Sequence, residues 1–186
     1  MFFTKKHFLS LLLTLAAASS SPFAHAADKV IDSASLELGS GAKVQMIRFG
    51  AQSDWSRRWF ASNGWHLGGY WDLSLGQWRA NAYRNQEGQH QNITDLGFTP
   101  VFRYQRDDQK GWYAEGGVGA NLLSELYNND QHRLSTAFQF GDHIGAGYVF
   151  DQQWEVGIKF QHFSNASIKR PNSGANFFLL KLSHRF

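Results

Sequence analysis

Apolar side chains recur at every second position through most of the chain, which is the pattern of β-strands whose two faces differ. Between residues 154 and 161, large apolar side chains occupy the even positions, while glycine, polar or charged residues occupy the odd ones. The same alternation predicts eight strands. They cover residues 33–40, 44–55, 65–80, 91–106, 112–123, 136–150, 154–166 and 175–186.

The connections between these strands are alternately short and long. Polar turns such as 107–110 and 151–153 are short, and the longer loops are 56–64, 81–90, 124–135 and 167–174. An even number of long strands, this order of connections and a final Phe186 after alternating apolar positions are typical of bacterial outer-membrane barrels. The sequence therefore predicts an all-β protein, an eight-stranded antiparallel transmembrane β-barrel of the outer membrane.

A soluble β-sandwich or lipocalin-like barrel produces the same alternation, with its apolar face turned inward, so periodicity alone leaves both alternatives open. In the membrane barrel the charged faces point into an interior just wide enough for side chains. We then expect an internal network of opposite charges and no open pore. The charged residues predicted to point inward are Asp72, Arg103, Glu115, Lys159, Lys181 and Arg185.

The first 26 residues have the features of a secretory signal peptide. Lys5 and Lys6 precede an apolar stretch at 8–18, and the small-x-small sequence of residues 24–26 is a cleavage site. The apolar stretch is shorter than the ~20 residues that a membrane span needs. We therefore predict a cleaved signal peptide at 1–26 and a single barrel at 27–186, and the export signal favours the membrane barrel.

The amino-acid composition excludes several kinds of functional site. The chain has no cysteine, which excludes disulfides, a thiol nucleophile and thiolate metal sites. The net charge of +3 is too small to indicate a nucleic-acid partner. The histidines show no spacing with carboxylates that is typical of metal ligands, so no metal and no cofactor are predicted.

Polar residues interrupt the apolar face near the end of the chain. The outward positions after Phe160 are His162 and Ser164, which lie about 6.6 Å apart along a strand. If Phe186 pairs near residue 152, the last hairpin places His162 opposite Asn176, with Cβ atoms about 5 Å apart. Ser164, His162 and Asn176 could then form a nucleophile, a general base and a residue that orients the base.

The loop lengths place this cluster at the outer rim of the barrel, because long loops of such barrels face outside. The outer leaflet there contains lipopolysaccharide, whose lipid A carries ester-linked acyl chains. A hydrolytic site at this rim would meet those esters. The alternative interpretation is that the polar side chains simply meet lipid headgroups.

The segment 162–166 (His-Phe-Ser-Asn-Ala) followed by 171–174 (Pro-Asn-Ser-Gly) resembles the signature of the PagL family, the lipid A 3-O-deacylases of Gram-negative outer membranes. Residues 140–147 resemble a second segment of that family. The resemblance implies a serine esterase that needs no metal and releases a 3-hydroxy fatty acid from the 3-position of lipid A. It further implies Asn165 as an oxyanion donor, through its backbone N–H or side chain, and Asn172 as a supporting residue. It also makes a homodimer one possible assembly.

The chain departs from the family at Asn176, where the family has a glutamate. An amide can accept the ring proton but cannot stabilise the imidazolium by charge. Three hypotheses follow: Asn176 suffices with lower activity, Asp142 on its own outward-facing position supplies the carboxylate, or the protein is a weak or inactive structural or adhesive barrel. A lipid acyltransferase is a further alternative.

Overall fold

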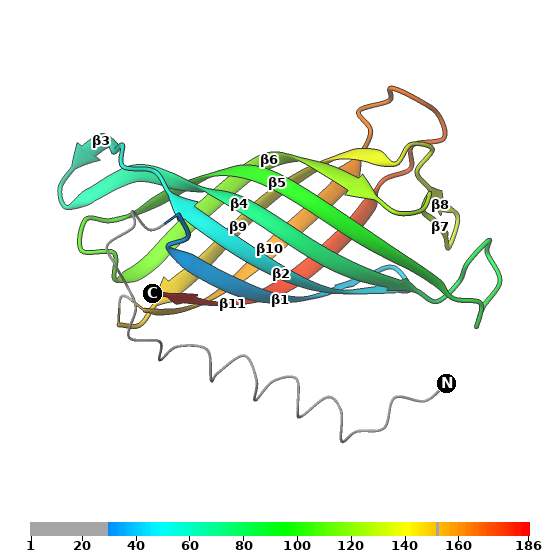
Figure 1. Ribbon diagram of the computed structural model, residues 1–186, viewed down its shortest axis with the longest axis horizontal. Helices are drawn as coiled ribbons and strands as arrows, with labels where there is room; N and C mark the ends of the chain where they lie inside the picture. Colours follow the sequence, from blue (N-terminus) through cyan, green and yellow to red (C-terminus); the bar gives the residue numbers. More distant parts are fainter. Residues whose placement is uncertain (1–29, 152) are drawn as a thin grey trace, which may run out of the picture. The chain divides into compact units, whose positions relative to one another are not determined.

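The computed structural model describes residues 30–151 and 153–186. Eight long antiparallel strands form a closed barrel in the neighbour order β2-β1-β11-β10-β9-β6-β5-β4, and β2 pairs with β4 to close it (Figure 1). The prediction of an eight-stranded antiparallel barrel is therefore confirmed. The expected signal peptide, residues 1–26, lies outside the described residues. The barrel strands are β1 (Ser33–Gly41), β2 (Val44–Asp54), β4 (Trp65–Ala80), β5 (Gln91–Arg106), β6 (Gly111–Leu123), β9 (Phe138–Val149), β10 (Trp154–Ser164) and β11 (Ala175–Arg185).

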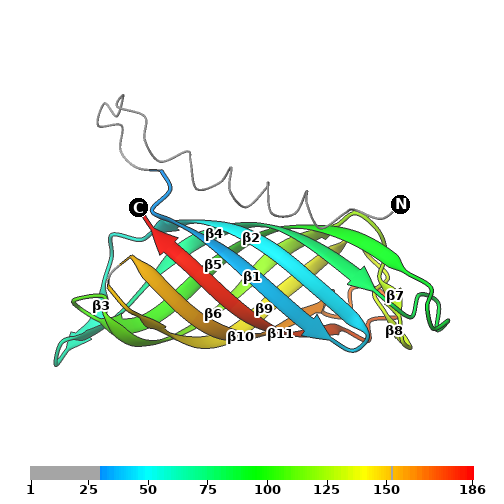
Figure 2. The same ribbon diagram turned by 90° about the horizontal axis from the view of Figure 1, so that it is seen from below.

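The two ends of the barrel differ. The C-terminus lies at one end, with the turns after β5 and β9, whereas β7 and β8 lie at the other end (Figures 1 and 2). We call the first the terminal end. We call the second, which carries the loops 81–90, 124–137 and 165–174, the loop end. Within the described ranges, no helix is long and apolar enough to cross a membrane.

Three short strands were not predicted, because two to four residues are too few for a periodic signal. β3 (Trp59–Ser62) pairs with β4, and β7 (Asn128–Asn129) pairs with β8 (His132–Arg133). Conversely, β10 ends two residues earlier than predicted. Its extension is broken by Ala166 and Ser167, whose backbones are left-handed, with φ of 51° and 63°.

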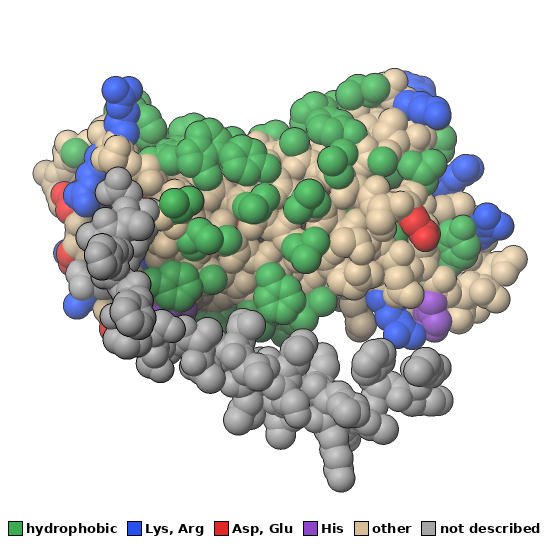
Figure 3. Space-filling model, viewed as in Figure 1, with side chains coloured by type: hydrophobic (Ala, Val, Ile, Leu, Met, Phe, Trp, Pro, Cys, Tyr) green, Lys and Arg blue, Asp and Glu red, His purple; other side chains and the backbone are tan. Residues whose placement is uncertain are grey.

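The outer wall of the barrel is apolar. Along β11 buried and exposed residues alternate, and the exposed ones between Phe178 and Leu182 are large and apolar. Figure 3 shows hydrophobic side chains over the barrel wall. A soluble barrel would turn this face inward, so the structure agrees with the membrane barrel and not with the soluble alternative. Toward the loop end the outward side chains become polar, as at Gln77, Arg79 and Thr94.

The interior of the loop-end half is filled by an apolar plug. Its centre is Trp78, whose ring centroid lies 4.6 Å from that of Phe163 and 4.8 Å from that of Phe177. Phe163 lies between His162 and Ser164 in the chain, and Phe177 follows Asn176. The plug therefore fixes the backbone from which the predicted site residues point outward. Its members are Val44, Met46, Trp78, Ala80, Ile93, Leu123, Tyr127, Leu134, Phe163, Ala175, Phe177 and Leu179.

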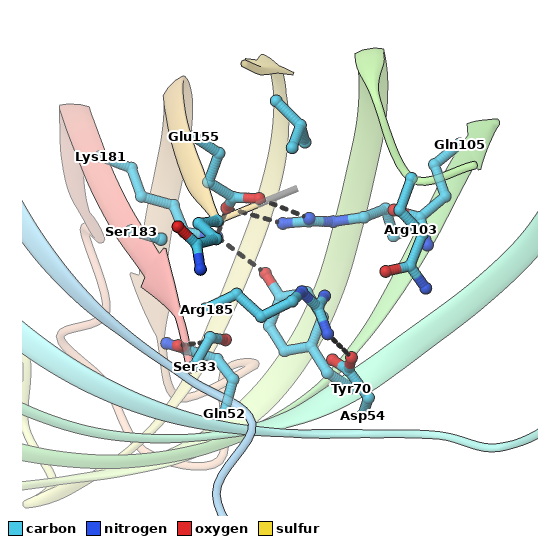
Figure 4. A pocket seen from close by; sticks show the side chains of 13 residues that line it. Ser33, Gln52, Asp54, Tyr70, Arg103, Gln105, Glu155, Lys181, Ser183 and Arg185 are labelled. Atoms are coloured by element: carbon cyan, nitrogen blue, oxygen red, sulfur yellow. Dashed lines mark hydrogen bonds and ion pairs between the residues drawn. The ribbon is translucent and has the colours of Figure 1, made fainter. Parts of the chain in front are cut away.

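The interior of the terminal-end half contains a network of opposite charges. Arg103 donates hydrogen bonds of 2.7 Å to both Glu115 and Glu155, and Lys181 lies 3.1 Å from Glu155. Figure 4 shows Arg103, Glu155 and Lys181 in this interior. A second group joins Lys159 to Glu37 at 2.6 Å. The predicted internal charge network is thus present. Five of the six residues expected to point inward are buried, and Arg185, at the strand end, pairs with Asp54.

We expect Glu115→Gln to lower the free energy of unfolding by roughly 3–5 kcal/mol, because Arg103 and Lys181 would lose a buried counter-charge. Equilibrium urea unfolding of the barrel in detergent micelles measures the change. Glu87→Gln is the matched control, since Glu87 pairs with Lys43 on the exposed surface, where the loss of an ion pair has little effect. Equal stability of the two variants would contradict the prediction.

Candidate active site

The predicted site residues lie together on the outer wall near the loop end. His162 on β10 is opposite Asn176 on β11 and, on its other side, opposite Asp142 on β9. This is the register that the sequence predicts for the last hairpin. His162, Ser164 and Asp142 are half-buried, and Asn176 is exposed. All four can therefore be reached from outside the barrel.

Asn176 fixes the orientation of the imidazole. The Nδ1 atom of His162 lies 2.6 Å from the side-chain oxygen Oδ1 of Asn176. With this amide orientation, Oδ1 accepts a hydrogen bond, so the ring proton is on Nδ1 and the lone pair is on Nε2. That tautomer is the one a general base needs.

Gly174 lies against the ring of His162 from the side of the loop. A Cβ atom at this position would be only 2.6 Å from Cε1 of the imidazole, and the backbone there has a φ of 75°. Only glycine accommodates both this left-handed backbone and this contact. Gly174 was part of the recognised Pro-Asn-Ser-Gly segment, but its contact with the imidazole was not predicted.

We expect Gly174→Ala to slow the reaction of Ser164 with a fluorophosphonate probe on the order of 10²-fold, because the displaced imidazole no longer activates the hydroxyl. Gly64→Ala is the matched control. Gly64 has almost the same φ, 77°, but nothing lies within 4 Å of its Cβ position. Labelling rates that fall equally in the two variants would show that backbone strain, and not the contact with His162, is responsible.

Ser164 lies on the same face as His162, two residues further along β10. Among the described residues, its hydroxyl makes no hydrogen bond to the imidazole. Hydrogen bonds between nucleophile and base are often long in free enzymes and shorten when substrate is bound. The structure therefore brings His162 and Asn176 into contact, and it places Ser164 on the same face of β10 as His162.

The turn after Ser164 differs in detail from the expectation. Asn165 is fully buried, its backbone N–H donates to Oδ1 of Asn172 at 2.9 Å, and its side-chain amide donates to the carbonyl oxygen of Lys169 at 2.8 Å. Both possible oxyanion donors of Asn165 thus already have acceptors within the chain. In the described part of the chain, the next two N–H groups, of Ala166 and Ser167, have none. Left-handed non-glycine residues such as these two tend to occur at functional sites.

An open apolar groove begins beside the site and crosses the wall toward β5. Asp142 and Phe160 line its near end. Asp142 is paired with His162, and Phe160 lies two residues before His162 on β10. Farther along, Gly116 has no side chain between Phe102 and Ile144, which leaves the wall hollow there. The groove can accommodate an extended hydrocarbon chain next to the imidazole.

In the ranges that the structure describes, no group of three or more His, Asp or Glu side chains is placed to hold a metal ion. Two of the other histidines, His66 and His184, have structural contacts. Nδ1 of His66 lies 2.8 Å from Asp107, and the ring of His184 packs on Trp154. The side chains at the site supply a hydroxyl, an imidazole, an amide and a carboxyl group.

Comparisons with known proteins were made over the whole chain. A family model described as "Lipid A 3-O-deacylase (PagL)" matches residues 45–185. "Lipid A deacylase PagL" of Pseudomonas aeruginosa is 32% identical over 171 residues, which cover 91% of this chain and 95% of that protein. "Lipid A deacylase PagL" of Bordetella bronchiseptica is 31% identical over 154 residues, 82% of each chain. The crystal structure of the outer membrane enzyme PagL superposes with a TM-score of 0.71 at 27% identity, covering 83% of this chain and 99% of that one.

Proposed function

The chain belongs to the PagL family of lipid A 3-O-deacylases, and from this premise we propose how its outer wall hydrolyses an ester. The protein is an enzyme of the outer membrane that removes the acyl chain from the 3-position of lipid A. The observation that carries the proposed mechanism is the 2.6 Å contact between His162 and Asn176 on the face that meets lipid.

In the proposed mechanism Ser164 is the nucleophile and His162 the general base and acid. Nε2 of His162 takes the hydroxyl proton as the oxygen of Ser164 attacks the ester carbonyl carbon. The tetrahedral intermediate collapses, the bond to the sugar oxygen breaks, and His162 donates its proton to that oxygen. Water, deprotonated by His162, then attacks the acyl-serine. The bond between the acyl carbon and the serine oxygen breaks, His162 returns the proton to that oxygen, and the 3-hydroxy fatty acid leaves.

We assign the oxyanion contacts to the turn that follows the nucleophile. The N–H groups of Ala166 and Ser167 are free of acceptors in the described part of the chain and lie two and three residues after Ser164. Fixed backbone donors near the reacting carbonyl stabilise the negative charge of the intermediate. In this proposal Asn165 and Asn172 act indirectly, because their hydrogen bond of 2.9 Å holds the turn in shape.

We place the loop end at the cell exterior and the site at the outer-leaflet rim. Three observations support this: three of the four long loops lie at that end, the outward residues beside it are polar, and the groove leads from Asp142 into the apolar wall. The fourth long loop, 56–64, carries β3 and lies at the terminal end. The ester would then lie at Ser164, with its acyl chain in the groove.

Two further expectations stay proposals. We propose that export removes residues 1–26, which the intact mass of the outer-membrane protein measures. We also propose a homodimer, which rests on the family resemblance alone and which sedimentation equilibrium in detergent tests.

The experiment that tests the mechanism uses refolded protein in detergent with lipopolysaccharide, followed by mass spectrometry of lipid A. Loss of one 3-hydroxyacyl mass is expected. Because Asn176 carries no charge, a weak or inactive barrel is the second candidate, and an unchanged mass spectrum would favour it. A gain of mass on an added acceptor alcohol would instead indicate an acyltransferase.

A further inference from the structure

Three exposed cations lie on two loops of the loop end: Arg133, Lys169 and Arg170. No salt bridge joins any of them to an acidic side chain within residues 30–151 and 153–186. In Figure 3, Lys and Arg side chains lie at both ends of the barrel, and several of them are at the loop end. This is unlike the barrel interior, where basic and acidic side chains pair, so these three cations are available to an anion from outside.

The acidic residues nearby are already engaged. Asp130 lies 3.3 Å from Lys43, which also binds Glu87 at 2.8 Å. Glu125 accepts a hydrogen bond of 3.3 Å from Gln91. The loop 165–174 itself contains no acidic residue. Within the described ranges, none of the three cations therefore forms an ion pair with Glu125 or Asp130, the acidic residues of the loop that carries Arg133.

Hydrogen bonds join the backbones of the two loops that carry the cations, although Arg133 and Lys169 are far apart in the sequence. The backbone N–H of Ser173 donates to the carbonyl oxygen of Arg133 at 3.0 Å, and the hydroxyl of Ser135 donates to the carbonyl oxygen of Lys169 at 2.7 Å. Leu134 and Asn172 also form a β-bridge. The cluster is therefore built on a connected backbone and not on two independent loops.

The same contacts attach the cluster to the active site. The side-chain amide of Asn165, the residue after Ser164, donates to the carbonyl oxygen of Lys169 at 2.8 Å. Ser173, which binds Arg133, precedes Gly174, and Gly174 touches the ring of His162. Next to Lys169, Ile168 is 68% exposed and can insert into the apolar layer, which leaves the cations at headgroup depth.

We propose that Arg133, Lys169 and Arg170 bind a phosphate monoester on the sugar headgroup of lipid A and so position the neighbouring ester at Ser164. The inference rests on the proposed function for the identity of the substrate. Guanidinium groups bind phosphate oxygens in pairs, and the ammonium adds a compact charge. The cluster is a positioning site: it touches the substrate away from the reacting atoms.

Binding is tested first, in the Ser164→Ala background, so that the result does not depend on turnover. The probes are detergent micelles that contain bisphosphorylated lipid A or lipid A freed of phosphate by a phosphatase. Adding Lys169→Gln and Arg170→Gln is expected to weaken binding of the phosphorylated lipid on the order of tenfold and to leave the phosphate-free lipid unaffected. Equal weakening for both lipids, or none, would overturn the proposal.

Arg84→Gln in the same background is the matched control. Arg84 is an exposed cation at the same end, on the loop 81–90, and stacks 5.0 Å from the ring of Tyr83. If Arg84→Gln weakens binding of the phosphorylated lipid as much as the double variant does, the effect comes from the general positive charge of the surface and not from a specific phosphate site. A phosphate dependence seen only with core-bearing lipopolysaccharide would place the phosphate on core sugars and overturn its assignment to lipid A.

Turnover is tested second, with Ser164 present. On phosphorylated lipid A, the Lys169→Gln, Arg170→Gln enzyme is expected to show a higher KM with little change in kcat, and on the phosphate-free lipid neither constant should change. If the protein binds phosphorylated lipid A selectively but does not hydrolyse it, the proposed function is contradicted and the phosphate site is supported. Hydrolysis without phosphate dependence would contradict this site alone.

Discussion

Replacing Ser164 with alanine is expected to lower the rate of lipid A deacylation by a factor between roughly 10³ and 10⁶. The alanine cannot form the acyl-enzyme, and only binding and the backbone donors of the turn remain. Because nucleophile and base act as one unit, His162→Ala should cost about as much, and the double variant should be no slower than Ser164→Ala. Release of 3-hydroxy fatty acid, measured by mass spectrometry, gives the rates.

The control for this prediction is Ser173→Ala, which removes an exposed hydroxyl from the same loop and should retain full activity. A fold check by urea unfolding separates lost chemistry from lost structure. Losses at Ser164 and His162 that simply multiply in the double variant would contradict a joint role. Full activity of Ser164→Ala would exclude it as the nucleophile.

Replacing Asn176 with glutamate is expected to raise kcat, by a factor of up to ~10⁴, the scale of the loss when a serine protease exchanges its triad carboxylate for an amide. In this chain Oδ1 of Asn176 already accepts the ring proton of His162 at 2.6 Å. The orientation of the base is therefore in place, and the missing contribution is a negative charge beside the imidazolium. Gln45→Glu, an exposed position elsewhere on the outer wall, controls for added negative charge at the membrane surface.

The Asp142→Asn variant tests whether Asp142 already supplies a negative charge to the imidazolium of His162. Asp142 faces His162 from β9, opposite to Asn176, and no ion pair involves it among the residues described. A gain in Asn176→Glu with no effect of Asp142→Asn would identify Asn176 as an orienting residue that lacks charge. A loss in Asp142→Asn with no gain in Asn176→Glu would assign the supporting charge to Asp142. No change in either variant would contradict both roles.

Most of the barrel follows from the sequence, because alternation along a strand records directly which side chains meet lipid and which meet the interior. The register of the last hairpin also follows, since a short turn at 151–153 leaves little freedom in how β10 and β11 pair. The pairing of His162 with Asn176 could therefore be predicted. The direction of the alternation cannot be read from periodicity alone, and the predicted signal peptide and Phe186 favour the membrane barrel.

The parts of the site that the sequence does not predict lie in the loop 165–174, where side chains do not alternate regularly between two faces. The family resemblance implies Asn165 as an oxyanion donor, through its backbone N–H or side chain, and in the structure these donors bind Asn172 and Lys169. The contact of Gly174 with the imidazole arises in the same loop. Such contacts arise between residues whose relative placement is fixed by the packing of two loops and not by spacing along one strand.

The filled interior has a consequence for the cell that carries the protein. The apolar plug around Trp78 occupies one half of the barrel, and the charge network around Arg103 occupies the other. From the side chains that fill the described part of the barrel, we expect no conductive path for ions or hydrophilic antibiotics. A cell can therefore make more copies of this protein without increasing the permeability of its outer membrane. An enzyme built on a wide porin barrel would increase that permeability with every copy.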